Sequence, residues 1–212
     1  MKTPRASLLK SISDLQTDYL DLYLIHWPAL SRKSSSSPEH KRLRLEAWEV
    51  LNEAKREGLV RYIGVSNFTP QHIRELKEET KYGIQGAFVQ METHPWYWKD
   101  AMEIQTTFEG EGPTIVGYAL LAEGKLLADT SSKILDDISE RLSISRVQVV
   151  LGWGLAKKWG VLVKSKDVTH LTQNLGASSL VGSLTPQECA EIDKISSLKG
   201  EEKRCWDPRQ VK

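Results

Sequence analysis

Apolar residues along the chain alternate between helical stripes and short strand-like runs. The first stripe follows Thr3-Pro4, where threonine suits a helix N-cap and proline suits the first turn, and it continues to Leu15. The next run predicts a strand from Leu20 to His26. Further predicted strands are 62–65, 87–90, 114–118 and 161–163. Further predicted helices are about 45–57, the segment after Thr69-Pro70, 133–142, 145–158, 168–175 and 186–195.

The predicted strands are short and mainly apolar, and each is followed by a helix or a loop. Such runs indicate a parallel sheet covered by helices rather than a sheet with one wet face. Right-handed strand–helix repeats build either a doubly wound sheet or a (β/α)8 barrel, and periodicity does not choose between them. No G-x-G-x-x-G follows a predicted strand, which disfavours a dinucleotide-binding doubly wound fold. The length of 212 residues predicts a single domain over residues 1–212.

Composition and charge narrow the class of partner. The 29 basic and 28 acidic residues give a formal net charge of +1, so neither nucleic acid nor an anionic membrane is expected as a partner. No run approaches the ~20 apolar residues that a membrane span needs. The 2 cysteines cannot form a disulfide framework, and the N-terminus has no secretory pattern. We therefore expect a cytoplasmic protein with reduced thiols.

Residues 31–38 form a polar, serine-rich segment with the sequence SRKSSSSP. The segment is longer than an ordinary connection between a strand and a helix. It is interpreted either as a disordered linker or as a loop that gates a site, and the sequence does not decide between the two.

Five sequence blocks at the predicted strand ends occur in an order that matches one family. They are Asp18–Pro28, Arg61–Phe68, Val89–Pro95, Gly117-Tyr118 with its leucine-rich turn, and Val163–Ser165. Together with the tail Cys205–Pro208, they resemble strands four to eight and the C-terminus of aldo-keto reductases. The resemblance implies an incomplete (β/α)8 barrel of the TIM type, with about five parallel strands and surrounding helices. It also implies a nicotinamide cofactor across the C-terminal mouth of the barrel, where residues at strand ends carry the function.

The resemblance gives His26 a catalytic role and Trp27 a place in the substrate pocket. His26 would donate a hydrogen bond to the substrate carbonyl oxygen, where negative charge develops as hydride arrives. Trp27 would form a wall of the pocket. The alternative readings are a hydrogen-bonded structural histidine and a plain aromatic residue at the barrel rim.

The resemblance assigns the nicotinamide ring to Ser66, Asn67, Gln90 and Tyr118. The carboxamide group offers one acceptor and two donors, which suit hydroxyl and amide side chains. Tyr118 would stack on the ring. Alternatively, Ser66-Asn67 would form a turn before the Thr69-Pro70 helix, which is compatible with cofactor binding. Tyr118 would alternatively be a core aromatic residue.

The resemblance assigns the adenosine end of the cofactor to residues after the last predicted strand. Lys164 and Ser165 would bind the 2′-phosphate of NADP, since an ammonium and a hydroxyl suit a dianion. Asn174 matches the adenine contact of the family. His170 stands where many members have arginine, and Gln173 where many have glutamate. A histidine lacks the bidentate fork and the dependable charge of arginine.

The turn 119–122, which includes Leu121, reads Ala-Leu-Leu-Ala where the family commonly has Ser-Pro-Leu-Gly. In the family this turn helps to clamp the pyrophosphate, so the departure predicts weaker cofactor affinity. The expected cofactor is NADP, as NADPH, and NAD is less favoured. The expected substrate is a small carbonyl compound or alcohol, and no metal ligand set is predicted.

The mechanism of the family also needs a tyrosine acid supported by a lysine and an aspartate. A phenol with a pKa near ~10 protonates an alkoxide poorly unless a neighbouring cation lowers that pKa. By the resemblance, these three positions and the first three barrel strands fall upstream of Met1. We therefore expect an N-terminally truncated barrel, as from a truncated gene model or a splice form.

Three functional hypotheses remain open at this point. The first is an NADP-dependent carbonyl or alcohol oxidoreductase, with the activity of this chain in doubt. The others are a non-catalytic cofactor-binding or regulatory protein and an inactive fragment. Open sheet edges at the first and last predicted strands also predict possible self-association.

Overall fold

The computed structural model describes residues 3–31, 33–129 and 132–211, and it divides into two compact units. Unit 1 comprises Met1–Gln90, Met102–Thr114 and Asp207–Lys212. Unit 2 comprises Met91–Ala101 and Ile115–Trp206. The expectation of a single domain over residues 1–212 stays a prediction.

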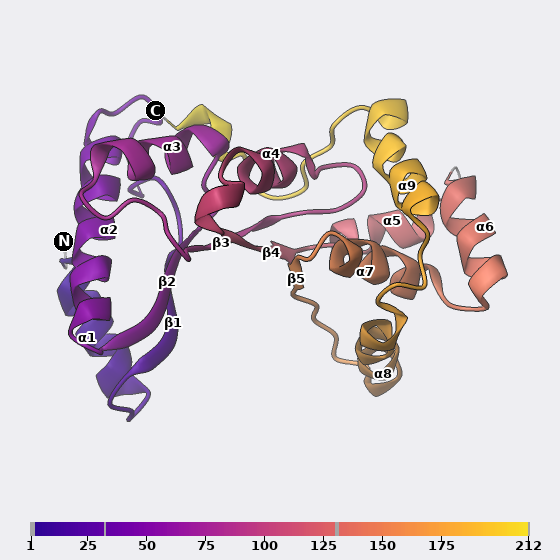
Figure 1. The fold of residues 1–212 in the computed structure, drawn as a ribbon, viewed down its shortest axis with the longest axis horizontal. Helices are drawn as coiled ribbons and strands as arrows, with labels where there is room; N and C mark the ends of the chain where they lie inside the picture. Colours follow the sequence, from indigo (N-terminus) through magenta and orange to yellow (C-terminus); the bar gives the residue numbers. More distant parts are fainter. Residues whose placement is uncertain (1–2, 32, 130–131, 212) are drawn as a thin grey trace. The chain divides into compact units, whose positions relative to one another are not determined.

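Five parallel strands follow the chain in the order β1-β2-β3-β4-β5, as predicted (Figure 1). Their bounds are β1 Leu20–Ile25, β2 Val60–Ser66, β3 Phe88–Glu92, β4 Thr114–Tyr118 and β5 Gly160–Val161. In unit 1 the register aligns Leu22 with Tyr62 and Ser66 with Gln90. In unit 2 it aligns Gly117 with Val161. The α/β class and the parallel sheet are confirmed.

Helices follow the strands throughout. Their bounds are α1 Pro4–Asp14, α2 Glu39–Arg56, α3 Pro70–Glu79, α4 Lys99–Thr107, α5 Lys125–Ala128, α6 Lys133–Leu142, α7 Arg146–Ala156, α8 Val168–Gly176 and α9 Pro186–Lys199. Short 3-10 turns are Glu109–Glu111, Ala122–Gly124, Ala177–Leu180 and Pro208–Gln210. No helix in the described ranges is long and apolar enough to cross a membrane.

Local capping explains where the helices begin. Thr3, Thr69, Ser145 and Thr185 are N-caps, and each side chain accepts a hydrogen bond from a backbone N–H of the first turn. At three of them a reciprocal side-chain bond completes a capping box. These caps are local in sequence, so the predicted helix starts at these positions are confirmed.

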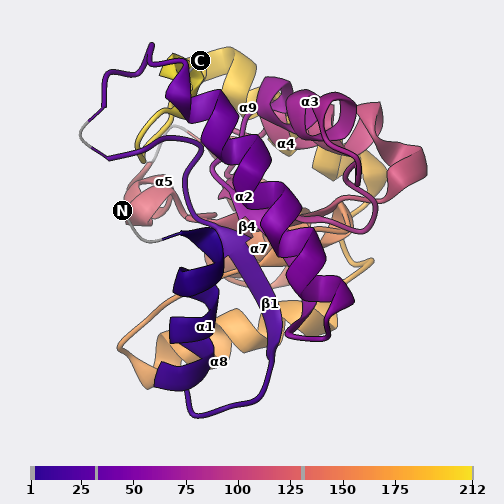
Figure 2. The same cartoon turned by 90° about the vertical axis from the view of Figure 1, so that its left-hand side faces the viewer.

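The two faces of the strands in unit 1 differ. Helix α2 packs on β1 and β2 and lies beside α1 and α3 (Figure 2). On the strands, Ile63 and Val65 are buried, with 2% and 1% of their surface exposed. On the other face, the aligned residues Leu22 and Tyr62 are 37% and 51% exposed. In β2 the exposed residues are confined to the start of the strand, and its last four residues are all buried.

Four segments differ most from the sequence prediction. Helix α2 begins at Glu39 rather than near residue 45, because its first two turns bury His40 and Arg44 rather than aliphatic residues. Helices α4 and α5 were not predicted. Strand β5 ends at Val161, and the exposed Leu162 and Val163 continue as irregular chain.

The serine-rich segment is tied to the start of α2. The Lys33 ammonium lies 2.6 Å from the Glu39 carboxylate, and His40 Nε2 donates to the Ser34 carbonyl at 2.7 Å. Gating and linker roles both remain predictions.

Candidate functional site

The predicted residues of unit 1 lie at the ends of three neighbouring strands. His26 and Trp27 follow β1, Ser66 is the last residue of β2, and Gln90 is aligned with Ser66 on β3. Parallel strands bring their C-terminal ends to one edge of a sheet, so this grouping follows from the topology. The structure therefore brings together all five predicted residues of this half, including Asn67.

Asn67 joins the three strand ends by hydrogen bonds. Its side-chain Nδ2 donates to the His26 carbonyl at 2.9 Å and to Ser66 Oγ at 3.2 Å, and its backbone N–H donates to the Gln90 carbonyl at 2.9 Å. Its φ of 64° is left-handed, a conformation that asparagine tolerates better than most residues. Ser66 and Asn67 are both buried, so the amide and hydroxyl have fixed positions.

His26 differs from the other histidines of unit 1. Its side chain is exposed, and its ring centroid lies 5.2 Å from that of Trp27. His40 and His72 are instead buried and hydrogen-bonded to backbone groups. An exposed imidazole at a strand end can donate to a ligand.

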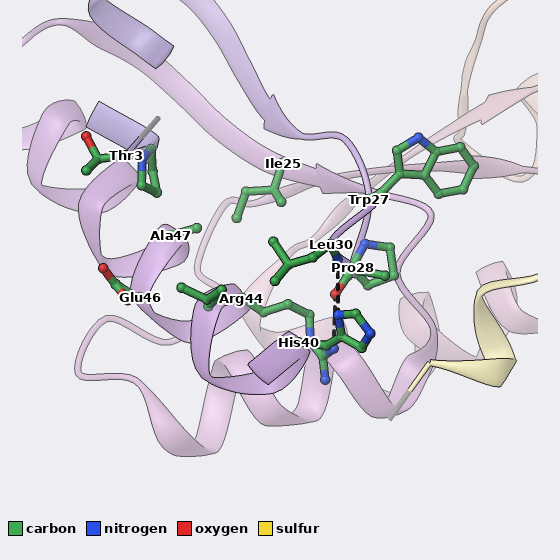
Figure 3. Close-up of a pocket in the computed structure, with 12 residues that line it drawn as sticks. Thr3, Ile25, Trp27, Pro28, Leu30, His40, Arg44, Glu46 and Ala47 are labelled. Carbon is green, nitrogen blue, oxygen red and sulfur yellow. Dashed lines mark hydrogen bonds between the residues drawn. The ribbon is translucent and has the colours of Figure 1, made fainter. Parts of the chain in front are cut away.

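A cavity of about 350 Å³ lies between the start of α1, β1 and α2 (Figure 3). Figure 3 shows Thr3 and Trp27 at opposite ends, and within the described chain Trp27 is the one predicted site residue in its lining. Two polar side chains that line the cavity form hydrogen bonds with the backbone. His40 Nδ1 accepts from Leu30 N–H at 3.1 Å, and Arg44 donates to the Pro28 carbonyl at 3.1 Å. These bonds hold the segment that follows β1.

Arg44 is itself paired in the interior. Its Nη2 lies 2.6 Å from Glu75 Oε2, with both side chains nearly inaccessible to solvent. Close by, His72 accepts from Thr69 N–H and bonds to the Val211 carbonyl at 3.1 Å. Burial, and next the nearby Arg44 cation, lower the pKa of His72 to about 4. The ring is therefore neutral at physiological pH.

In unit 2, three predicted residues line a second cavity of about 300 Å³. They are Tyr118, Leu121 and Lys164. The turn that carries Leu121 holds Ala119, Ala122 and Glu123 at positive φ values of 55°, 48° and 56°. Such conformations cost a residue with a Cβ on the order of 1 kcal/mol, so the alanine at 122 is a strained substitute for the glycine common in the family.

The remaining predicted residues of unit 2 surround the start of α8. Ser165 Oγ accepts from Asp167 N–H at 3.0 Å, and the Asp167 carboxylate caps α8 by accepting from His170 N–H at 3.1 Å. This hydrogen bond holds the pKa of Asp167 below its usual value. Lys164 and His170 are exposed, and Asn174 lies one helical turn after His170. Lys164 and His170 are accessible to a ligand, although the Asp167 carboxylate would repel an anion that approached the cap itself.

Tyr118 is connected to residues that the sequence did not single out. Burial raises the pKa of its hydroxyl, as do the neighbouring Cys205 and Glu92. Its carbonyl accepts from Thr93 N–H at 3.1 Å. Glu92 and His94 lie within the Val89–Pro95 block and have no predicted role, yet two ionisable side chains at a buried strand end indicate a built site.

Both halves contain groups that suit a nicotinamide dinucleotide. In unit 1 a fixed hydroxyl and two amides match the donors and acceptor of a carboxamide. In unit 2 an aromatic ring and an ammonium border one cavity. No cluster of three or more potential metal ligands occurs among the described residues.

Comparison with known proteins gives one consistent result. A sequence model described as "Aldo/keto reductase family" matches residues 2–197. Methylglyoxal reductase DkgA of Escherichia coli is 32% identical over 205 residues, which cover 93% of this chain and 66% of the relative. Glyoxal reductase of Bacillus subtilis is 30% identical over 210 residues, covering 99% of this chain and 68% of the relative. The chain thus spans about two thirds of the length of these relatives.

Solved structures agree with the sequence relatives. The apo form of Gox0644 has a TM-score of 0.80 and 28% identity, covering 97% of this chain and 68% of that one. A mutant of Gox0644 in complex with NADPH has a TM-score of 0.80 and 27% identity, covering 99% of this chain and 70% of that one.

Proposed function

This chain belongs to the aldo/keto reductase family, and we propose that it binds NADP(H) and takes part in hydride transfer between the nicotinamide ring and a small aldehyde or ketone. NADPH is the favoured cofactor and NADH the less favoured one. The proposal concerns the chain as a contributor to the site, since it spans about two thirds of its relatives.

The observation that carries this proposal is the arrangement at the strand ends of unit 1. Asn67 ties the ends of β1, β2 and β3 together through the His26 carbonyl, Ser66 Oγ and the Gln90 carbonyl. Ser66 is aligned with Gln90 on β3, and the exposed His26 follows β1. A carboxamide held by Ser66, Asn67 and Gln90 has a fixed orientation, which selects the ring face that gives up hydride. Preorganised groups of this kind are what a reductase needs.

His26 would act on the substrate. When bound, the cofactor supplies the hydride; the imidazole donates a hydrogen bond to the carbonyl oxygen and stabilises the negative charge that develops there. Trp27, in ring contact with His26, would exclude water and limit the size of the substrate.

In unit 2, Tyr118 would present its ring to the nicotinamide, and the turn at Leu121 would contact the pyrophosphate. Lys164 and Ser165 would bind the 2′-phosphate, with a single hydrogen bond from His170. Asn174 would contact the adenine. The cavity shared by Tyr118, Leu121 and Lys164 supports this assignment.

The substrate is proposed to be a small reactive carbonyl compound. Relatives at 32% and 30% identity are named methylglyoxal reductase and glyoxal reductase. Methylglyoxal is therefore the first substrate to test.

The test separates cofactor binding from hydride transfer. We expect the purified chain to bind NADPH. We expect methylglyoxal to accelerate the loss of NADPH absorbance once a segment that carries the tyrosine acid, with its lysine and aspartate, is joined to the chain, because the alkoxide formed by hydride transfer needs a proton donor. His26→Ala should slow this loss by about 100-fold, because one donor to the developing oxyanion is removed, while the affinity for NADPH changes little. Saturable binding without turnover would favour a non-catalytic cofactor-binding role, and a chain that neither binds nor oxidises NADPH would contradict the proposal.

A further inference from the structure

The carboxylate of Glu92 holds the C-terminal segment of unit 2. We call residues 201–206 the C-terminal strap. Glu92 is 1% exposed and accepts hydrogen bonds from Arg204 N–H at 2.6 Å and Cys205 N–H at 3.0 Å. The Lys203 ammonium is paired with the same carboxylate, and His94 Nε2 lies 2.9 Å from its Oε1. One side chain thus binds three successive strap residues.

This carboxylate is charged despite its burial. Burial alone raises the pKa of Glu92, but the hydrogen bonds from His94, Lys203 and Arg204 outweigh it and bring the pKa down to about 2. A buried charge of this kind is stable only while its partners stay in place. The strap and the end of β3 are therefore bound to each other strongly.

Weaker contacts extend the attachment along the strap. Glu202 N–H donates to the Trp96 carbonyl at 3.2 Å. The Lys203 ammonium lies 4.8 Å from the centre of the Tyr97 ring. At the start of the strap, Glu201 lies 3.3 Å from the Lys99 ammonium in an ion pair with solvent access. Exposed pairs of this type contribute little to stability.

The strap reaches a residue of the proposed cofactor site. The Tyr118 hydroxyl is in side-chain hydrogen-bonding contact with Cys205, and burial first, then Cys205 and Glu92, raise the pKa of this hydroxyl. On the strand side, Thr93, the neighbour of Glu92 in sequence, donates from its N–H to the Tyr118 carbonyl. Tyr118 is therefore held by its backbone from β3 and by its hydroxyl from the strap.

We propose that Glu92 is a positioning residue for the cofactor site: it holds the strap so that Cys205 contacts the Tyr118 hydroxyl and fixes the orientation of the ring. This inference rests on the proposed function, because it gives Tyr118 the nicotinamide-facing role. The Glu92 carboxylate at the end of β3 takes no part in hydride transfer itself, and the inference gives this buried charge a role in orienting Tyr118.

The first test measures the strap without any cofactor. Cys189→Ser leaves Cys205 as the single thiol, and the rate of its modification by an aromatic disulfide reagent reports how firmly the strap is held. Glu92→Gln keeps the shape of the side chain but is neutral and has a single accepting oxygen. It therefore cannot accept hydrogen bonds from the Arg204 and Cys205 N–H groups through two charged oxygens. We expect it to raise the rate by about tenfold, and Glu201→Gln, the matched control on the strap, to leave the rate unchanged.

The second test measures the coupling to Tyr118 through the dissociation constant of NADPH. Glu92→Gln should weaken binding by about tenfold in the wild-type chain, but by less than about twofold in a Tyr118→Phe background, where the hydroxyl contact is already lost. A purely structural defect would weaken binding equally in both backgrounds. Lys203→Met removes only one of the partners of Glu92, so it should change the thiol rate and the NADPH affinity in the same directions by about threefold. It replaces Glu92→Gln if that variant does not fold.

The outcomes distinguish the inference from the proposed function. Faster thiol modification together with non-additive loss of NADPH affinity supports the inference. An unchanged thiol rate, or equal losses of affinity in the two backgrounds, overturns it while leaving the proposed function intact. A folded wild-type chain that does not bind NADPH overturns both, whatever the thiol rate shows.

Discussion

Ser66 and Asn67, two of the predicted nicotinamide residues of unit 1, are buried and joined by a hydrogen bond, whereas Lys164 and His170 on the predicted phosphate side of unit 2 are exposed. Ser66 and Asn67 have fixed amide and hydroxyl positions before any ligand arrives. Lys164 and His170 project from accessible surface. A neutral carboxamide must be oriented by geometry, while a phosphate can be attracted by charge that needs less positioning. The two units thus differ in how their predicted residues would bind a ligand: by preorganised geometry in unit 1 and by electrostatic attraction in unit 2.

The largest expected effect concerns the buried carboxylate of unit 2. The pKa of Glu92 is about 2 in the fold against 4.5 ordinarily, so its stabilising effect is present above pH 4.5 and is lost as the pH falls toward 2. The loss should be on the order of 3 kcal/mol of unfolding free energy. Denaturant unfolding at a series of pH values measures it. Glu92→Gln should flatten this part of the curve, and an unchanged slope would show that another group is responsible.

Unit 1 should respond at higher pH through His72. Its pKa is about 4 in the fold against 6.5 ordinarily, so the fold favours the neutral ring; the stabilising effect is present above pH 6.5 and is lost as the pH falls to 4. We expect a loss of about 3 kcal/mol over this window, similar to that for Glu92. His72→Gln preserves a capping-box residue at this position of α3 and removes the titration, so it should abolish the slope. A slope that persists in this variant would contradict the assignment.

The hydrogen bonds of Asn67 give the next effect. Asn67→Ala removes donors to the His26 carbonyl and Ser66 Oγ and places alanine at a φ of 64°, so we expect about 2 kcal/mol lower unfolding free energy. Asn52→Ala removes a bond to the Trp48 carbonyl within α2 and should cost less than about 0.5 kcal/mol. Equal losses in the two variants would mean that the strand ends are not held by Asn67.

A smaller effect is expected from the phosphate side. His170→Arg should tighten NADPH binding by about threefold and leave NADH binding unchanged, because a guanidinium adds a dependable charge and a second hydrogen bond. Isothermal titration with both cofactors gives the ratio of dissociation constants. Equal tightening toward NADH would mean that the arginine does not meet the 2′-phosphate.

Much of the fold could be predicted because its signals are local. The caps at Thr3 and Thr69 and the apolar runs of β1 and β4 lie within a few residues of the structures that they specify. The grouping of His26, Ser66 and Gln90 follows from the ends of parallel strands meeting at one edge. Their roles in binding, a cytoplasmic location and self-association through strand edges stay predictions.

The parts that were missed depend on partners distant in sequence. The start of α2 was misplaced because His40 and Arg44 are polar, and their burial depends on Ser34, Pro28 and Glu75. The role of Glu92 could not be predicted because its partners on the strap lie more than 100 residues away, as with Arg204, which is 112 positions further along the chain. No local periodicity reports such a contact.

The most direct test of the account is a titration of the chain with NADPH, followed by quenching of its 7 tryptophans. We predict saturable quenching, with binding about tenfold weaker in Lys164→Ala and unchanged in Lys194→Ala, which removes an equal charge from the surface of α9. Saturation in the wild type and a selective loss at Lys164 would support an NADPH site of the aldo/keto reductase type. A folded chain without saturable quenching, or equal affinities in all three proteins, would contradict it.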